Sequence, residues 1–93
     1  MQQKKYDLED RLIEYAIKIS DIVDALPNTR LENYLAGQMI RSGTSPALNY
    51  GEAQSAESQA DFIHKMKICL KELRETFIGL KLTRRKQWKK ITN

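Results

Sequence analysis

The sequence is poor in cysteine, proline and glycine: its 93 residues include one cysteine, two prolines and four glycines. The single cysteine, Cys69, excludes an internal disulfide and suits a reducing compartment such as the cytosol. Few prolines and glycines leave room for few turns, so long helices are expected. One cysteine and one histidine, His64, are too few to build a zinc site.

Long apolar runs are also absent. No stretch approaches the roughly 20 apolar residues that span a bilayer, so we expect no membrane partner. The start, MQQKKYDLED, has no apolar stretch after its lysines, and we expect no signal peptide. Ninety-three residues make at most one domain, so we expect residues 1–93 to form one helical-bundle domain in the cytoplasm. A core this small is marginal by itself.

Positive charge is concentrated at one end of the chain. Residues 1–82 carry 11 basic and 12 acidic residues, a net charge of −1, whereas residues 83–93 carry five basic residues and no acid. This basic C-terminal tail contains Arg84, Arg85, Lys86, Trp88, Lys89 and Lys90. Basic side chains pair with phosphates and an indole stacks on bases, so these six residues are candidate nucleic-acid-binding residues. The alternative is a solvated end with Trp88 packed on the bundle.

Three segments have the apolar spacing of amphipathic helices. The first is expected to begin after an N-cap at Asp7 and to end before Pro27. The second is expected from about Leu31 to Gln54. The third follows the capping pattern Ser58-Gln-Ala-Asp61 and runs to about Leu82. Residues 83–93 either extend the third helix or form a loose arm.

The second helix carries a polar stripe where an apolar seam is expected. Its members, at intervals of 4, 3, 4 and 3, are Gln38, Ser42, Ser45, Asn49 and Glu52. If the stripe faces the core, Asn49 and Glu52 need partners, because an unpaired buried charge is costly. The candidate partners are Arg41, Lys65 and Lys71. We expect a buried polar network that fixes helix register; a ligand groove and a catalytic site are the alternatives. Pro46 is expected to kink this helix.

No combination of residues predicts catalysis. Cys69 and His64 are five positions apart, which places them about 140° apart around a helix. Cys69 also lies on an apolar seam, where it is expected to be a small buried hydrophobic residue. No glycine-rich phosphate loop or nucleophile elbow occurs. We therefore expect no enzyme activity, no cofactor, and no catalytic or metal-binding residues.

The second and third helices carry a family resemblance. The segments 38–53, 58–66 and 71–76 resemble the four-helix-bundle proteins encoded in 23S rRNA intervening sequences. They are also similar to the accessory variability protein of diversity-generating retroelements. The matching positions are Arg41, Ser45, Asn49, Glu52, Ala53, Asp61, Phe62 and Glu72. The match spans about residues 7–82, and as a set its motifs are fairly specific.

The resemblance implies an all-α, up-down antiparallel helical bundle from a bacterial cytoplasm, assembled as a homopentamer. Family members continue into a fourth helix, which here is expected to be short or missing. For the retroelement relatives it implies binding to a reverse transcriptase and to nucleic acid; for the others, ribosomal RNA is a candidate partner. The structural polar core is expected at Arg41, Ser45, Asn49, Glu52 and Glu72. We therefore expect a non-enzymatic oligomeric scaffold that binds RNA, another single-stranded nucleic acid, or a nucleic-acid-processing partner. The alternative is a protein–protein interaction module.

Overall fold

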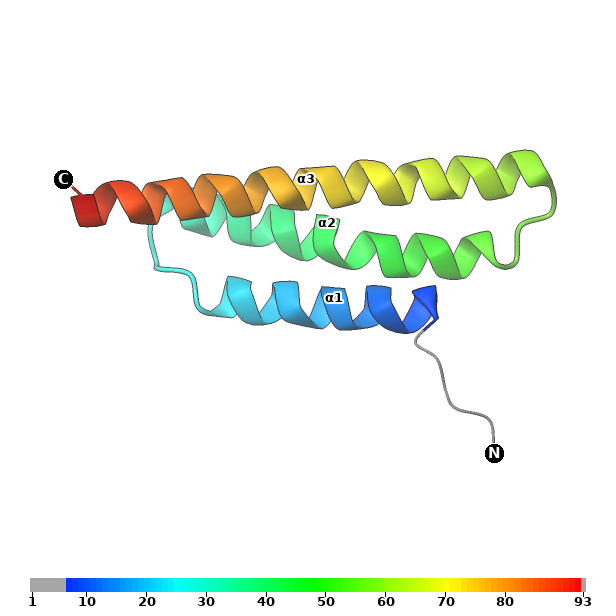
Figure 1. Ribbon diagram of the computed structural model, residues 1–93, viewed down its shortest axis with the longest axis horizontal. Helices are drawn as coiled ribbons and strands as arrows, with labels where there is room; N and C mark the ends of the chain where they lie inside the picture. Colours follow the sequence, from blue (N-terminus) through cyan, green and yellow to red (C-terminus); the bar gives the residue numbers. More distant parts are fainter. Residues whose placement is uncertain (1–6, 93) are drawn as a thin grey trace, which may run out of the picture.

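Three α-helices make up the described part of the chain. The computed structural model describes residues 7–92, in which the elements are α1 (Leu8–Asp24), α2 (Arg30–Ala53) and α3 (Gln59–Thr92), with no strand. Successive helices run in opposite directions (Figure 1). The expectation of an all-helical chain is confirmed, but a four-helix arrangement is not, because residues 7–92 form three helices. Asn93, at the end of the predicted tail, and residues 1–6 lie outside the described residues.

Side-chain caps lie at the starts of α1 and α3, as the sequence predicted. Asp7 accepts a hydrogen bond from the backbone N–H of Asp10 at 2.9 Å. Ser58 likewise accepts from the backbone N–H of Asp61 at 3.0 Å. Each cap satisfies one of the backbone donors that the first turn of a helix leaves without an intrahelical partner. These local signals explain why the predicted starts agree closely with the observed ones.

Pro46 lies inside α2, which continues through it to Ala53. Proline has no backbone N–H and its ring displaces the preceding turn, so a helix bends where it occurs. Figure 1 shows α2 changing direction near its middle. The thiol of Cys69 in α3 donates a hydrogen bond to the Pro46 carbonyl at 3.4 Å. The bend therefore lies directly against α3.

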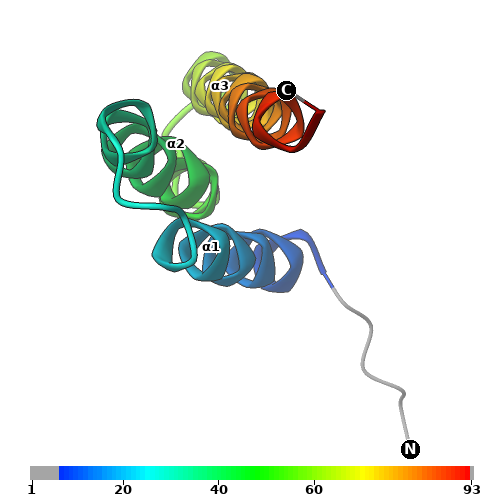
Figure 2. The ribbon, with the colours of Figure 1, turned by 90° about the vertical axis from the view of Figure 1, so that its left-hand side faces the viewer.

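The three helices form an open arrangement in which α2 packs against both neighbours. No Cα atom of α1 lies within 8 Å of α3 among the described residues. The end-on view in Figure 2 shows α1 and α3 on two different sides of α2. The chain is correspondingly flat, with principal extents of 51 × 36 × 18 Å.

The core lies where α1 and α3 both meet the first half of α2. Ile19, Leu35 and Met39 are buried together. Half-buried residues surround them: Tyr15, Val23, Leu26, Leu31 and Leu80. Two glycines allow the helices to approach closely here. A Cβ on Gly43 would lie 2.7 Å from Ile19 Cγ2, and one on Gly79 would lie 2.8 Å from Met39 Sδ.

An apolar row on α3 remains exposed. Ile63, Leu70 and Phe77 follow one another at seven-residue intervals, and each is about half exposed. A seven-residue interval keeps side chains on nearly the same side of a helix. The row lies on a side of α3 away from buried Cys69 and Thr76, and α1 does not approach α3, so no helix of the described chain covers it. A row of exposed apolar side chains on one side of a helix suits contact with another helix.

Candidate functional site

The predicted basic tail is the last part of α3, which stays helical to Thr92. Of the two alternatives, the extension of the helix is therefore observed for residues 83–92. Around its exposed indole lies an open hollow of about 530 Å³. The residues lining it are Lys81, Arg84, Arg85, Gln87, Trp88 and Ile91. Side chains three and four positions apart share one side of a helix, so the helix itself gathers these cations around Trp88.

The six candidate nucleic-acid-binding residues do not all contribute to this hollow. Arg84, Arg85 and Trp88 line it, whereas Lys86, Lys89 and Lys90 do not. Lys86 points instead toward Glu32 of α2, with 3.8 Å between its Nζ and Oε1 of Glu32. Consecutive residues of a helix are spaced about 100° apart around its axis. Basic side chains that follow one another in the sequence therefore cannot all lie in a single patch.

Sequence reasoning missed Lys81, because the predicted basic tail began only at residue 83. Its spacing was nevertheless a usable signal, since Lys81 lies four residues before Arg85 and seven before Trp88. The Lys81 Nζ lies 4.8 Å from the centroid of the Phe77 ring. This cation–π contact joins the basic hollow to the exposed apolar row.

Buried Glu32 fastens the end of α3 to the start of α2. The Glu32 side chain is 1% exposed and accepts a hydrogen bond from the Thr29 hydroxyl. Gln87 Nε2 donates to its other carboxylate oxygen at 3.3 Å. Gln87 and Lys86 thus hold this part of α3 on α2, while Trp88 is 65% exposed. Sequence reasoning missed Glu32, although Thr29-Arg-Leu-Glu32 fits the same capping pattern as Ser58–Asp61.

The polar stripe of α2 lies along the border with α3, with its members in different surroundings. Ser42 is buried, and its hydroxyl lies 2.7 Å from the hydroxyl of Thr76. Asn49 is half buried and donates to the carbonyl of Ser45 at 3.0 Å and to its hydroxyl at 2.8 Å. Gln38 is exposed. Among the stripe members, Ser42 is therefore the one whose buried side chain makes a polar contact with α3.

Glu52 lies at the surface, not in the polar core where the sequence placed it. Its side chain is 61% exposed and pairs with Lys65, one of the three candidate partners, at 2.6 Å. Hydrogen bonding and charge from Glu52 raise the pKa of Lys65. The stripe is centred roughly one residue, or about 100°, from the buried side of α2, so its last member turns outward.

Arg41 links α2 to α3 at the same border. Its guanidinium lies 2.9 Å from the buried carboxylate of Glu72 and also binds Glu75. The hydrogen bonds that Arg41 donates to Glu75 and then to Glu72, together with the charge of Glu72, raise the pKa of Arg41. The expected contribution of Arg41 and Glu72 to an inter-helix polar network is thus present, with Arg41 itself half exposed. Lys71, the third candidate partner, lines a groove between α2 and α3 that also includes Ser42 and Glu75.

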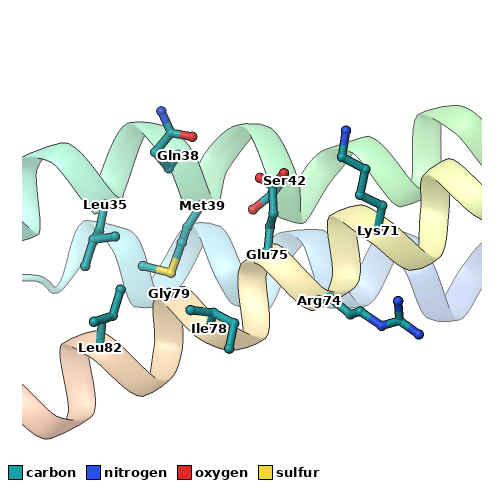
Figure 3. A pocket seen from close by; sticks show the side chains of 10 residues that line it. All are labelled: Leu35, Gln38, Met39, Ser42, Lys71, Arg74, Glu75, Ile78, Gly79 and Leu82. Carbon is teal, nitrogen blue, oxygen red and sulfur yellow. The ribbon is translucent and has the colours of Figure 1, made fainter.

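That groove runs between α2 and α3 and has a volume of about 510 Å³. Its lining residues, drawn in Figure 3, are Leu35, Gln38, Met39, Ser42, Lys71, Arg74, Glu75, Ile78, Gly79 and Leu82. Leu35 and Leu82 lie toward one end, and Lys71 and Arg74 toward the other. The groove therefore combines an apolar end with a basic one.

The sequence profile of the 23S rRNA-intervening sequence protein family matches residues 4–91. The chain belongs to this family. It is also similar to a solved structure from Bacteroides thetaiotaomicron VPI-5482, a protein of unknown function from the S23 ribosomal protein family. The two are 39% identical with a TM-score of 0.80, and the match covers 88% of this chain and 76% of that one. No curated protein matches.

In this member of the 23S rRNA-intervening sequence protein family, Cys69 and His64 do not form a nucleophile–base pair, because they have different surroundings. Cys69 is buried, and burial raises the pKa of its thiol. His64 is exposed on α3. Between Asp7 and Thr92 no group of three or more His, Cys, Asp or Glu side chains is arranged to hold a metal ion. Nor does that range contain a helix long and apolar enough to cross a membrane.

Proposed function

We propose that this protein is a cytoplasmic, non-enzymatic homo-oligomer that binds single-stranded RNA through the last turns of α3. The observation that carries the proposal is the gathering of Lys81, Arg84 and Arg85 around exposed Trp88, beside a hollow of about 530 Å³. The family takes its name from an intervening sequence of 23S rRNA, which supports RNA as the first polyanion to test.

The chemistry of this site suits an unpaired strand. Cations neutralise phosphates without reading sequence, so base preference should be weak. An exposed indole has room for a base on its face, and such stacking contributes about 1–3 kcal/mol per base. Because bases in a duplex are already stacked, single strands should bind more tightly than duplex.

Assembly would strengthen the binding of RNA. Each copy would carry one basic helix end, and several ends acting together bind more tightly without any new contact. Five copies, the number that the family resemblance implies, would bring together about 25 basic residues from residues 83–93.

The test is a titration of fluorescently labelled single-stranded RNA at several salt concentrations. We expect Trp88→Ala to weaken binding by about 1–3 kcal/mol. Arg84→Gln should make the slope of log K against log salt concentration shallower by roughly 0.7, the value for one phosphate contact on a single strand. Lys67→Gln is the matched control, since it removes one exposed charge from α3 away from the hollow. Equal losses for Arg84→Gln and Lys67→Gln would contradict a specific site.

A protein-interaction module is the second candidate function. It is favoured by the exposed apolar row of Ile63, Leu70 and Phe77, whose spacing suits an added helix. A reverse transcriptase is one partner that the resemblance implies. If RNA does not bind at low salt, and Leu70→Ser abolishes binding to a purified candidate partner, this second function replaces the first.

A further inference from the structure

Charge is divided between the two outer helices. Residues 8–24 of α1 carry five acids and two bases, a net of −3, whereas residues 59–92 of α3 carry three acids and ten bases, a net of +7. Residues 30–53 of α2 carry two of each. Because α1 and α3 do not approach each other in one chain, this attraction is not used between them.

The acidic helix also has an apolar pair on its outer side. Ile13 and Ile17 are 46% and 59% exposed. The members of this side, at intervals of 3, 4, 4 and 3, are Asp10, Ile13, Ile17, Asp21 and Asp24. At about 100° per residue they lie well away from the buried Leu12 and Ile19. The outer side of α1 is therefore an apolar strip flanked by carboxylates.

The groove between α2 and α3 has the complementary character. Ile78 and Leu82 contribute exposed apolar surface, at 53% and 45%. Lys71 and Arg74 supply positive charge at its other end (Figure 3). Glu75, the acid in the lining, is already paired with Arg41. The groove thus offers an apolar strip with two cations to a helix that carries isoleucines and acids.

We propose that the outer side of α1 of one copy docks in the α2–α3 groove of the next copy. The proposal rests on the homo-oligomer proposed above and names its interface. The α1 helix packs on α2 of its own chain through buried Leu12 and Ile19 and does not approach α3. Its acidic side is the exposed side of Ile13 and Ile17, so only a second copy can bring that side to the groove. The two surfaces are different parts of the same chain, which makes the contact head-to-tail and lets it close into a ring.

Charge reversal tests the contact by sedimentation velocity, with circular dichroism to confirm the helices. Asp21→Lys with Asp24→Lys, or Lys71→Glu with Arg74→Glu, should each dissociate the wild-type assembly. All four substitutions in one chain should restore it, because the charges are again opposite. Failure of the four-fold variant to reassemble, with its helices intact, would overturn the charge pairing that defines this interface.

A matched apolar pair gives the second readout. Ile17→Ser should raise the dissociation constant of the assembly by about tenfold or more, whereas Ile22→Ser, on the opposite side of α1, should change it little. The reverse result would overturn the proposal and place the interface on the other side of α1. A monomeric wild type would end both this inference and the proposed oligomer. An oligomer that both variants leave unchanged would overturn this inference alone, and RNA titration of Trp88→Ala would still test the α3 site.

Discussion

The buried hydroxyl pair of Ser42 and Thr76 joins α2 and α3 at a distance of 2.7 Å. Thr76 also donates to the carbonyl of Glu72 at 3.1 Å, which leaves its oxygen free to accept from Ser42. Replacing Thr76 by valine would leave the Ser42 hydroxyl buried without this partner. We expect Thr76→Val to lower the free energy of unfolding by about 1–3 kcal/mol in urea denaturation.

The double variant Ser42→Ala with Thr76→Val is the control, because it removes both hydroxyls. Replacing both partners by apolar groups is often nearly neutral. Its cost should be smaller than the sum of the two single costs. A cost equal to that sum would show that the two hydroxyls act independently.

We expect the buried thiol of Cys69 to make the free energy of unfolding depend on pH. Burial raises its pKa in the folded protein. At neutral pH the thiol is protonated in both states, and the stability is unaffected. As the pH rises above about 8.5, the unfolded thiol ionises first, so the free energy of unfolding should fall. Cys69→Ala should lose this component; identical pH profiles for the two proteins between pH 7 and 10 would contradict it.

Single acidic residues show where sequence reasoning succeeds and fails. The stripe spacing placed Glu52 in the core, but its carboxylate is exposed and pairs with Lys65. Glu32, which the stripe argument did not include, is the acid that is 1% exposed. A spacing fixes which residues share a side, but not whether that side faces a neighbour. Which side of α2 is buried depends on where α3 packs, and the sequence of α2 alone does not determine this.

Two glycines of α2, Gly37 and Gly43, differ in how much space a side chain would have at their positions. A Cβ on Gly43 would press on the branched side chain of Ile19, whereas nothing lies within 4 Å of one on Gly37. We expect Gly43→Ala to destabilise by about 1–3 kcal/mol through overpacking. Gly37→Ala should stabilise by up to about 1 kcal/mol, because alanine favours the helix. Equal shifts in thermal midpoint would show that α1 is not packed closely on α2.

The end of α3 should depend on Glu32. Removing this buried acceptor leaves Gln87 and Thr29 without their partner, at a cost of about 1–3 kcal/mol. Amide hydrogens near Gln87 should then exchange faster in Glu32→Ala. Glu57→Ala, an exposed change in the α2–α3 connection, should leave their exchange unchanged. Unchanged protection in Glu32→Ala would show that α3 holds its last turns without α2.

Helix boundaries were predictable where a local signal exists. Asp7 and Ser58 are capping residues that mark the starts of α1 and α3, and Pro27 limits the end of α1. The end of α3 carries no such signal, because neither glycine nor proline follows Gly79. Nothing local therefore stops the helix at Leu82, and contacts from Gln87 and Lys86 to α2 favour its continuation. The hollow around Trp88 exists only because of that continuation.

At the scale of the whole molecule, the open arrangement leaves apolar surface on both α1 and α3. Covering it by association should stabilise the fold, and stability gained by association depends on concentration. We expect the thermal midpoint to rise with protein concentration. Light scattering at micromolar concentration should give a mass well above the 10.8 kDa of one chain. A constant midpoint together with a mass near 10.8 kDa would contradict assembly.

The end of α3 extends past the α1–α2 connection (Figure 1). In a closed ring whose axis runs along the helices, rotation carries every copy into the next without turning any of them over. All the α3 ends, each with its own Trp88, would then project from the same rim. The two rims of such a ring would be chemically unlike, because only one of them would carry the Trp88 indoles. A bound strand would follow one rim around its circumference, and the opposite rim would stay open to a different molecule.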